Sequence, residues 1–244
     1  MLIVGNWKMY GLAGGIAEAR ALAAALVAGP TTSRIALCPP ATLIARLVEA
    51  VAGSNISIGG QDCHALIEGA YTGDLSAEML GDAGATLVIL GHSERRAGHC
   101  ETDQIVAGKV SGAIRAGLMP IICVGETLEQ RKAGGAEAVV TAQIVGSLPD
   151  LVAEAEFAIA YEPVWAIGSG LTPTPTEIEA MHGAIRETLA SRFSGVGRTV
   201  PILYGGSVKP ANAGELLHLN EVGGALVGGA SLKAADFEAI VRAV

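Results

Sequence analysis

Eight short apolar runs recur along this chain of 244 residues, and each is followed by a longer mixed segment. The runs are four to six residues long and lack the alternation of polar and apolar residues that marks a strand with one wet face. They predict β-strands buried on both faces, as in parallel sheets that helices cover. The predicted strands are Leu2–Trp7, Arg34–Cys38, Ile56–Gln61, Thr86–Leu90, Pro120–Val124, Phe157–Tyr161, Val200–Tyr204 and Gly224–Val227.

Segments between the runs show the spacing of helices that bury one side. Apolar residues recur there at intervals of three and four positions, which predicts a stripe facing the sheet. The stripes are Ile16, Ala19, Ala23, Leu26 and Val27; Leu43, Ile44, Leu47, Val48 and Val51; Val106, Val110, Ala113 and Ile114; and Ile178, Met181, Ile185 and Leu189. Thr174-Pro175-Thr176-Glu177 predicts the start of the sixth helix, because a capping Thr, Pro at the first helical position and Glu at the third are typical of helix N-termini. Gly134 and Gly135 predict a break in the helical region that follows the fifth strand.

Repeated strand-then-helix units without a shift in composition predict a single (β/α)8 barrel, an α/β fold with a parallel eight-stranded core, as one domain over residues 1–244. A doubly wound open sheet is the alternative. That fold typically has a Gly-x-Gly-x-x-Gly turn after its first strand, where this chain has Asn6-Trp7-Lys8-Met9-Tyr10-Gly11. In a barrel, the carboxyl ends of all strands meet at one face, so polar residues there are expected to converge.

Charge and cysteine content argue against several classes of function. A net charge of −8 is unfavourable for a nucleic-acid or anionic-membrane partner. No apolar stretch reaches the roughly 18 residues of a membrane helix, and no secretory signal is visible at the start. Cys38, Cys63, Cys100 and Cys123 have neither C-x-x-C nor metal-ligand spacing. We therefore expect a cytoplasmic protein with reduced thiols and no metal site.

Polar residues follow the first and fourth predicted strands. Asn6 and Lys8 end the first; a Lys is usually a surface cation, but in a barrel mouth its ammonium would face a ligand. The fourth strand leads into His92-Ser93-Glu94-Arg95-Arg96. His92 would lie near a helix N-terminus, which is expected to lower its pKa and keep the ring a neutral donor. A hydrogen-bonded core histidine is the alternative for His92.

The other histidines, His64, His99, His182 and His218, support no functional assignment, because none shares a strand end with a catalytic partner.

Glu162 lies at the exit of the sixth predicted strand, within Ala160-Tyr161-Glu162-Pro163-Val164-Trp165-Ala166-Ile167-Gly168. A carboxylate that removes a proton from carbon needs a dry site, and a loop with Pro at one end and Gly at the other can close over it as a unit. The segment predicts a catalytic base under a lid. A surface Glu at the start of a loop is the alternative.

Two glycine pairs follow the seventh and eighth predicted strands, in Tyr204-Gly205-Gly206-Ser207 and Val227-Gly228-Gly229-Ala230. Glycine lets backbone N–H groups approach an anion closely, and phosphate sites of barrels commonly form in these two loops. Ordinary strand-to-helix turns are the alternative for either pair alone. Their presence in adjacent loops favours a phosphate site.

Together these motifs resemble the triosephosphate isomerase family over essentially the whole chain. The matching segments are Asn6-x-Lys8-Met9, Tyr71-Thr72-Gly73, Gly91-His92-Ser93-Glu94-Arg95-Arg96, Ala160 to Gly168, and Tyr204-Gly205-Gly206-Ser207. The resemblance implies interconversion of dihydroxyacetone phosphate and D-glyceraldehyde 3-phosphate through an enediolate-like intermediate, without a cofactor. A Glu base beside a neutral His under a closing loop is a known feature of that family.

The resemblance also implies which residues form the site. They are Glu162, His92, Lys8, Asn6 and Glu94 for catalysis, and Asn6, Lys8, Gly168, Ser207, Gly228 and Gly229 for substrate binding. Glu94 would have a supporting role, its alternative being a simple ion pair with Arg95, Arg96 or Lys8. Trp165 and Ile167 would pack the lid, and Tyr204 would latch it.

A long connection, Asp62 to Leu75, follows the third predicted strand, and loops of this length are usually functional. In the family it inserts into a second subunit, so the resemblance implies a homodimer with Thr72 near the partner site; a lone surface loop is the alternative. The chain departs from the family's common residues at Tyr10 and Asp62, which bear on the interface, and at Leu171, which bears on the lid hinge.

Other functions would account for some or all of these motifs. A lyase or synthase on a phosphate-binding barrel would explain the glycine pairs, but not a base beside a short lid and a neutral His donor. A non-catalytic phosphate-binding barrel would not need Glu162. An isomerase of a closely related sugar phosphate would keep every motif.

Overall fold

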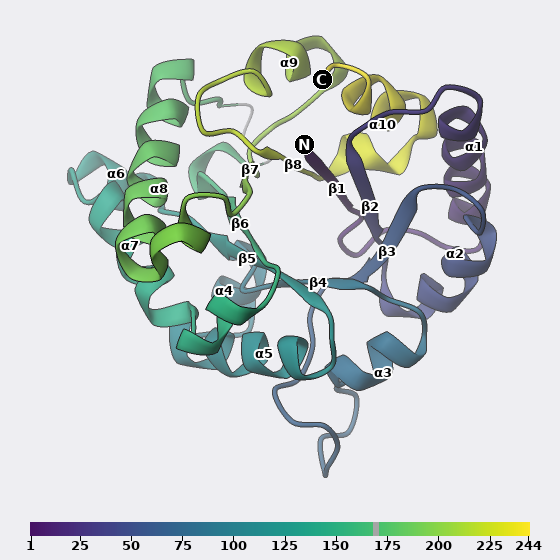
Figure 1. Cartoon of the computed structure of the whole chain (residues 1–244), viewed down its shortest axis with the longest axis horizontal. Coiled ribbons are helices and arrows are strands. Elements are labelled where there is room, and N and C mark those ends of the chain that lie inside the picture. Colours follow the sequence, from purple (N-terminus) through teal and green to yellow (C-terminus); the bar gives the residue numbers. More distant parts are fainter. Residues whose placement is uncertain (168–170) are drawn as a thin grey trace.

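The structure is a computed structural model that describes residues 1–167 and 171–244. Within them, eight parallel strands pair in sequence order and β8 pairs with β1, which closes the barrel (Figure 1). The strands are β1 Leu2–Asn6, β2 Arg34–Cys38, β3 Ile56–Gly60, β4 Leu87–Leu90, β5 Met119–Val124, β6 Ala158–Tyr161, β7 Ile202–Tyr204 and β8 Gly224–Val227. The predicted (β/α)8 barrel is confirmed, and the open doubly wound sheet is excluded.

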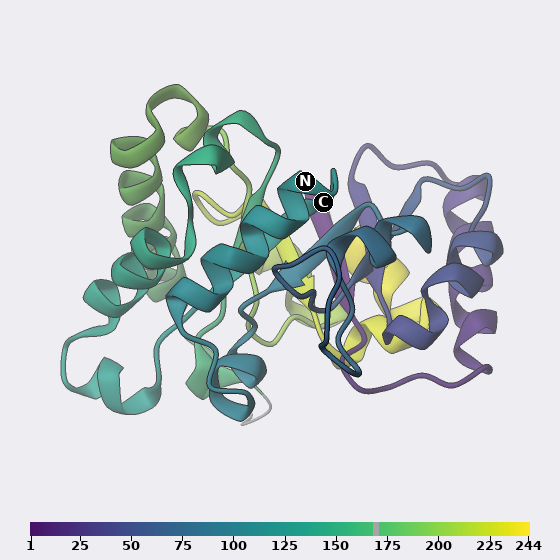
Figure 2. The same cartoon turned by 90° about the horizontal axis from the view of Figure 1, so that it is seen from below.

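Helices surround the barrel, and the two chain ends lie close together (Figures 1 and 2). The α-helices are α1 Gly15–Ala28, α2 Ile44–Ala50, α3 Ala77–Asp82, α4 Ser93–Gly98, α5 Asp103–Arg115, α6 Leu128–Lys132, α7 Ala136–Ser147, α8 Pro175–Gly197, α9 Pro210–Leu216 and α10 Ala234–Val241. Short 3-10 helices are η1 Ala41–Leu43, η2 Asp150–Glu154, η3 Val164–Ala166 and η4 Gly229–Leu232.

Alternate residues of each strand face two different apolar layers, as the twofold repeat of a strand requires. One layer fills the barrel and includes Val4, Ile89 and Ile121. The other lies between barrel and helices and includes Ile3 and Val88. Both faces of the strands are therefore dry, which explains why their sequences are uniformly apolar.

The predicted elements match the structure closely, with differences at their ends. Thr174 caps α8, and its side chain and that of Glu177 bond each other's backbone N–H as the capping box predicts. The break at Gly134–Gly135 separates α6 from α7. Val27 was wrongly placed on the buried stripe of α1, because its side chain is 61% exposed. One position of the 3.6-residue repeat decides whether such a residue faces the sheet or water.

His182, on α8, is a core residue. It is fully buried, and Nδ1 lies 3.1 Å from the carbonyl oxygen of Glu221, to which a neutral ring donates. Burial lowers the pKa of His182 to about 4, so the ring is uncharged at neutral pH. This agrees with giving it no functional assignment.

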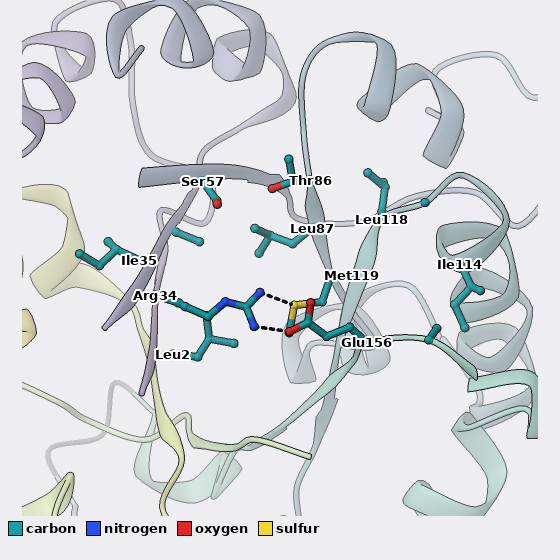
Figure 3. Close-up of a pocket in the computed structure, with 13 residues that line it drawn as sticks. Leu2, Arg34, Ile35, Ser57, Thr86, Leu87, Ile114, Leu118, Met119 and Glu156 are labelled. Atoms are coloured by element: carbon teal, nitrogen blue, oxygen red, sulfur yellow. Dashed lines mark hydrogen bonds and ion pairs between the residues drawn. The ribbon is translucent and has the colours of Figure 1, made fainter. Parts of the chain in front are cut away.

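The barrel mouth at the amino ends of the strands holds a hollow of about 360 Å³. Figure 3 shows Arg34 reaching across it to Glu156 and Met119, with Ser57 and Thr86 at its wall. Arg34 pairs with Glu156, and its Nη2 lies 3.5 Å from the sulfur of Met119. An exposed ion pair of this kind contributes at most about 1 kcal/mol to stability.

In the part of the chain that the structure describes, none of the helices combines the length and apolar character needed to cross a bilayer.

Candidate active site

The polar residues at the strand ends line one hollow of about 850 Å³ at the carboxyl mouth of the barrel. The sequence-predicted residues that meet there are Asn6, Lys8, His92, Glu94, Glu162, Ser207, Gly228 and Gly229. Gly168, the remaining predicted residue, lies outside the described residues. The expected convergence of residues far apart in sequence is therefore found for all the others.

Glu162 follows β6 and is 2% exposed. Its backbone N–H donates to the carbonyl of Val124 at the end of β5 (2.7 Å), which fixes the start of its side chain. Oε1 lies 2.7 Å from Nε2 of His92, and Oε2 accepts the N–H of Ser93 at 2.9 Å. Burial raises the pKa of Glu162, but His92, the Ser93 N–H and Lys8 lower it more, so the pKa lies below its usual value. The resting side chain is an ionised, buried carboxylate.

His92 caps the first turn of α4. Its Nδ1 accepts the backbone N–H of Glu94 at 3.2 Å, which only a ring without a proton on Nδ1 can do. The ring proton is then on Nε2, which points at Glu162. This geometry agrees with the predicted neutral donor.

The expected direction of the His92 pKa is wrong for this arrangement. Burial lowers the pKa, but the charge and hydrogen bond of Glu162 and the charge of Glu94 raise it above its usual value. The helix N-terminus is read correctly from the sequence. What the sequence does not reveal is that the carboxylate of Glu162 rests directly against the ring.

Lys8 has a backbone conformation that few non-glycine residues adopt, with φ of 51°. Its N–H donates to Oδ1 of Asn6 (2.9 Å), and its carbonyl accepts from Nε2 of Gln61 (2.9 Å). The ammonium lies 2.6 Å from Oε1 of Glu94. The surrounding contacts hold a strained backbone, a pattern that is typical of functional sites. Of the alternatives for Glu94, the ion pair with Lys8 is the one formed.

Gln61 and Ser93 were missed as site residues by the sequence analysis. Gln61 ties the carbonyls of Lys8 and Cys38 together, and Ser93 uses only its backbone N–H on Glu162. A polar residue at the end of an apolar strand was a signal for Gln61. A contact made through the backbone, as by Ser93, leaves no signal in the side-chain sequence.

The two glycine pairs serve different needs. A Cβ on Gly205 would lie 2.9 Å from Cγ of Glu162, and one on Gly206 would lie 2.1 Å from the Tyr204 hydroxyl. Close packing therefore requires this first pair. A Cβ on Gly229 would meet open space, and one on Gly228 would lie 3.6 Å from Cε of Lys8. The second pair leaves room in the hollow, where η4 begins and its first N–H groups have no partner within the helix.

The loop after Glu162 is tied to the barrel through a buried carboxylate. Oε1 of Glu126 accepts from the indole of Trp165 (2.8 Å), the hydroxyl of Tyr161 (3.2 Å) and Arg131 (3.2 Å). The guanidinium of Arg131 also lies over the Trp165 ring, 4.9 Å from its centre. The buried hydroxyl of Tyr204 has no hydrogen-bond partner among the described residues.

A closed parallel barrel with a buried carboxylate, an imidazole donor and a lysine at its carboxyl mouth defines a (β/α)8-barrel enzyme. The family model described as triosephosphate isomerase matches residues 1–244. The triosephosphate isomerase of Caulobacter vibrioides is 60% identical to this chain, in an alignment that covers 100% of this chain and 96% of the relative. That of Afipia carboxidovorans is 57% identical, over 99% of this chain and 96% of the relative. The crystal structure of triosephosphate isomerase from Bartonella henselae has a TM-score of 0.91 and 48% identity, and covers 99% of this chain and 98% of that one.

This chain belongs to the triosephosphate isomerase family and is an isomerase.

Proposed function

We propose that Glu162, His92, Lys8 and Asn6 carry out the isomerisation. The enzyme interconverts dihydroxyacetone phosphate and D-glyceraldehyde 3-phosphate, a step of glycolysis. The observation that carries the assignment is the buried pair of Glu162 Oε1 and His92 Nε2, 2.7 Å apart in the hollow that Lys8 also lines. A base, an electrophilic donor and a cation thus face the same small volume.

Glu162 must leave its resting contacts to act, because a substrate cannot fit between two atoms 2.7 Å apart. Turning away from His92 and Ser93 removes the hydrogen bonds that lower its pKa, while burial continues to raise it. The carboxylate becomes a stronger base at the substrate. It removes a proton from the carbon next to the carbonyl and returns a proton to the neighbouring carbon.

The other residues stabilise the negative charge that this transfer creates. His92 would donate from Nε2 and Asn6 from its amide to the two substrate oxygens, while the Lys8 ammonium offsets the enediolate charge. Glu94, paired with Lys8 at 2.6 Å, would support the orientation of that ammonium. Ser207, Gly228, Gly229 and, on lid closure, Gly168 would bind the phosphate.

Lid closure would exclude water from the intermediate. Trp165 and Ile167 would pack the lid, and the Tyr204 hydroxyl, buried without a partner among the described residues, is a donor able to latch it.

Isomerisation in deuterium oxide tests the function. We expect dihydroxyacetone phosphate to acquire one solvent deuterium at the hydroxymethyl carbon, at only one of its two hydrogens, because a single base acts on one face. Mass spectrometry and proton NMR would follow the exchange. A non-catalytic phosphate-binding barrel would bind inorganic phosphate without exchange, and a lyase would release carbon–carbon cleavage products. A four-carbon sugar phosphate that turned over faster would point to a different substrate.

We further propose that residues 1–244 form one domain and that the enzyme works in the cytoplasm, without nucleic-acid or membrane partners. The barrel takes strands from Leu2 to Val227, the thiols of Cys38, Cys63, Cys100 and Cys123 are all unpaired, and the net charge is −8.

A second copy of the chain is the proposed partner. The 62–75 loop projects from the body of the molecule (Figure 1) and exposes Leu66, Ile67 and Tyr71. Met9, next to Lys8, is 95% exposed. Apolar side chains gathered on a projecting loop and beside a site are typical of an interface between subunits. Thr72 would then reach the site of the partner.

Charged residues anchor the base of this loop. Asp62 accepts from Nζ of Lys109 (2.7 and 2.9 Å) and pairs with Arg95 (2.8 Å). Burial raises the pKa of Asp62, against the opposing charges of these two partners. Glu101 binds both the lysine and the arginine as well. Asp62, where the chain departs from the family's common residue, is thus a carboxylate that two cations neutralise. This residue is compatible with an ordered loop.

Thr72→Arg tests the dimer. We expect the wild type to sediment at twice its chain mass of 24.6 kDa, and T72R to shift toward the monomer and lose most activity, since a bulky cation would not fit a packed interface. Val145, exposed on α7, provides the control: V145E should stay dimeric and active. A wild type that is monomeric and fully active at micromolar concentration would reject the proposal.

A further inference from the structure

Helix α4 carries the contacts of both catalytic side chains, but little apolar packing holds it. Its N–H groups at Ser93 and Glu94 bond Glu162 and His92. The helix has six residues, the structure describes all of them, and none is buried. A helix this short is not stable by itself. Its position must therefore come from specific polar contacts.

Arg96 supplies these contacts on the barrel side. Its side chain is 15% exposed, and the guanidinium donates from Nε to the carbonyl of Gly91 (2.8 Å) and from Nη2 to the carbonyl of Cys123 (3.2 Å). Nη1 pairs with Asp103 (2.6 Å), and Nη2 also donates to the Ser147 hydroxyl (3.0 Å). The Ser147 hydroxyl in turn donates to Asp103 (3.1 Å), which completes a closed network.

The two carbonyls that Arg96 joins lie close in the chain to the backbone that holds the two catalytic residues. Gly91 directly precedes His92. Cys123 precedes Val124, whose carbonyl accepts the N–H of Glu162 at 2.7 Å. One planar group thus connects the chain that carries the imidazole to the strand that holds the base.

We propose that Arg96 is a positioning residue that sets the separation of His92 and Glu162. The inference rests on the proposed roles of these two residues. The hydrogen bonds of Arg96 go to other groups than these two side chains, and Arg96 is not among the residues that line the hollow. It acts by holding two peptide groups at fixed positions, which in turn fix the N–H groups of α4.

Only arginine has the geometry for this arrangement. Its rigid fork presents donors in several directions within one plane, whereas a lysine ammonium is a single point. Gly91 shows how tight the fit is, because a Cβ there would lie 3.1 Å from Nη2 of Arg96 and 2.9 Å from a methyl of Val106. Its φ of 66° also disfavours other residues.

Arg96→Lys tests the proposal in the full-length enzyme. We expect kcat to fall about a hundredfold, because small displacements of reacting groups cost about this much. KM should change less than threefold, because the glycine-rich loops after β7 and β8, which we propose bind the phosphate, are untouched. Guanidinium ion added to Arg96→Ala should restore part of kcat. In nitrogen NMR, the wild type should show one neutral His92 tautomer protonated on Nε2, and R96K a mixture.

Arg192→Lys is the matched control. Arg192 also donates to two backbone carbonyls, of Val145 and Leu148, and pairs with Asp150, but it is remote from the hollow. R192K should lower the melting temperature about as much as R96K and leave kcat within twofold.

The outcomes separate this inference from the proposed function. If R96K keeps the wild-type kcat and His92 signals while Glu162→Gln is inactive, Arg96 has no positioning role and the base assignment stands. If R96K loses only stability, in parallel with R192K, its role is structural alone. If Glu162→Gln is fully active, the proposed function fails first.

Discussion

Glu162→Gln is expected to lower kcat at least about a thousandfold while inorganic phosphate still binds. The amide has nearly the shape of the carboxylate but cannot accept a proton from carbon, and general-base catalysis alone commonly contributes 10²–10⁴-fold. The coupled assay on D-glyceraldehyde 3-phosphate measures turnover, and inhibition of residual activity or calorimetry measures phosphate binding. Because Ser207, Gly228 and Gly229 are unchanged, the phosphate affinity should stay within about threefold.

The resting geometry adds a second consequence of this substitution. Glu162 accepts on both oxygens, from Nε2 of His92 and from the N–H of Ser93. A glutamine can accept on one atom only, so its NH2 group would oppose one of these donors. We expect the side chain to leave the resting position more readily.

Two further variants separate loss of the base from its displacement and from loss of a neighbouring charge. Glu162→Asp keeps a carboxylate but shortens it by one methylene, and should lose about a hundredfold through misplacement alone. Glu94→Gln changes an exposed carboxylate of the same hollow and should lose much less. Activity of Glu162→Gln within tenfold of the wild type would refute the base assignment.

The fold could be predicted from the sequence because each strand is dry on both faces. That burial leaves a record in every residue of the strand, and the barrel then follows from the number of repeats. The convergence of polar side chains could be predicted where they lie at a strand end, as for Lys8, His92 and Glu162. These positions need only the general rule that the carboxyl ends of barrel strands meet.

Features that depend on contacts between distant segments could not be predicted. The glycines at 205 and 206 were interpreted as freeing backbone N–H groups, but they make room for Glu162 and the Tyr204 ring. The pKa of His92 was expected to be lowered, but it is raised. The contact with Glu162 that raises it forms only when the segments that follow β4 and β6 are brought together. The bonds of Arg96 to Gly91 and Cys123 likewise join separate strands.

Lys8→Met is expected to lower kcat/KM about a thousandfold. One ammonium about 4 Å from a developing negative charge is worth about 4 kcal/mol at an effective dielectric of 20, which corresponds to roughly a thousandfold in rate. The enzyme itself carries a net charge of −8, so attraction of a phosphorylated substrate must be local. Loss of Lys8 should therefore raise KM and lower kcat together, unlike Arg96→Lys.

The fold should tolerate this substitution. The ion pair of Lys8 with the exposed Glu94 contributes at most about 1 kcal/mol. The backbone at φ 51° strains a methionine no more than a lysine. The hydrogen bonds with Asn6 and Gln61 use the N–H and the carbonyl of residue 8, which the variant keeps. We expect the melting temperature to change by a few degrees at most, so lost activity would report on the ammonium itself.

Lys209→Met is the matched control, because Lys209 lines the same hollow from the start of α9, two residues after Ser207. It should change KM less than tenfold, mainly at low salt, and leave kcat intact, since a peripheral charge acts on encounter with the substrate. Lys8→Arg should recover part of the lost activity by restoring the charge in a different geometry. If Lys8→Met and Lys209→Met had equal effects on kcat, the ammonium of Lys8 would act only in attracting the substrate, and stabilisation of the enediolate would have to come from His92 and Asn6 alone.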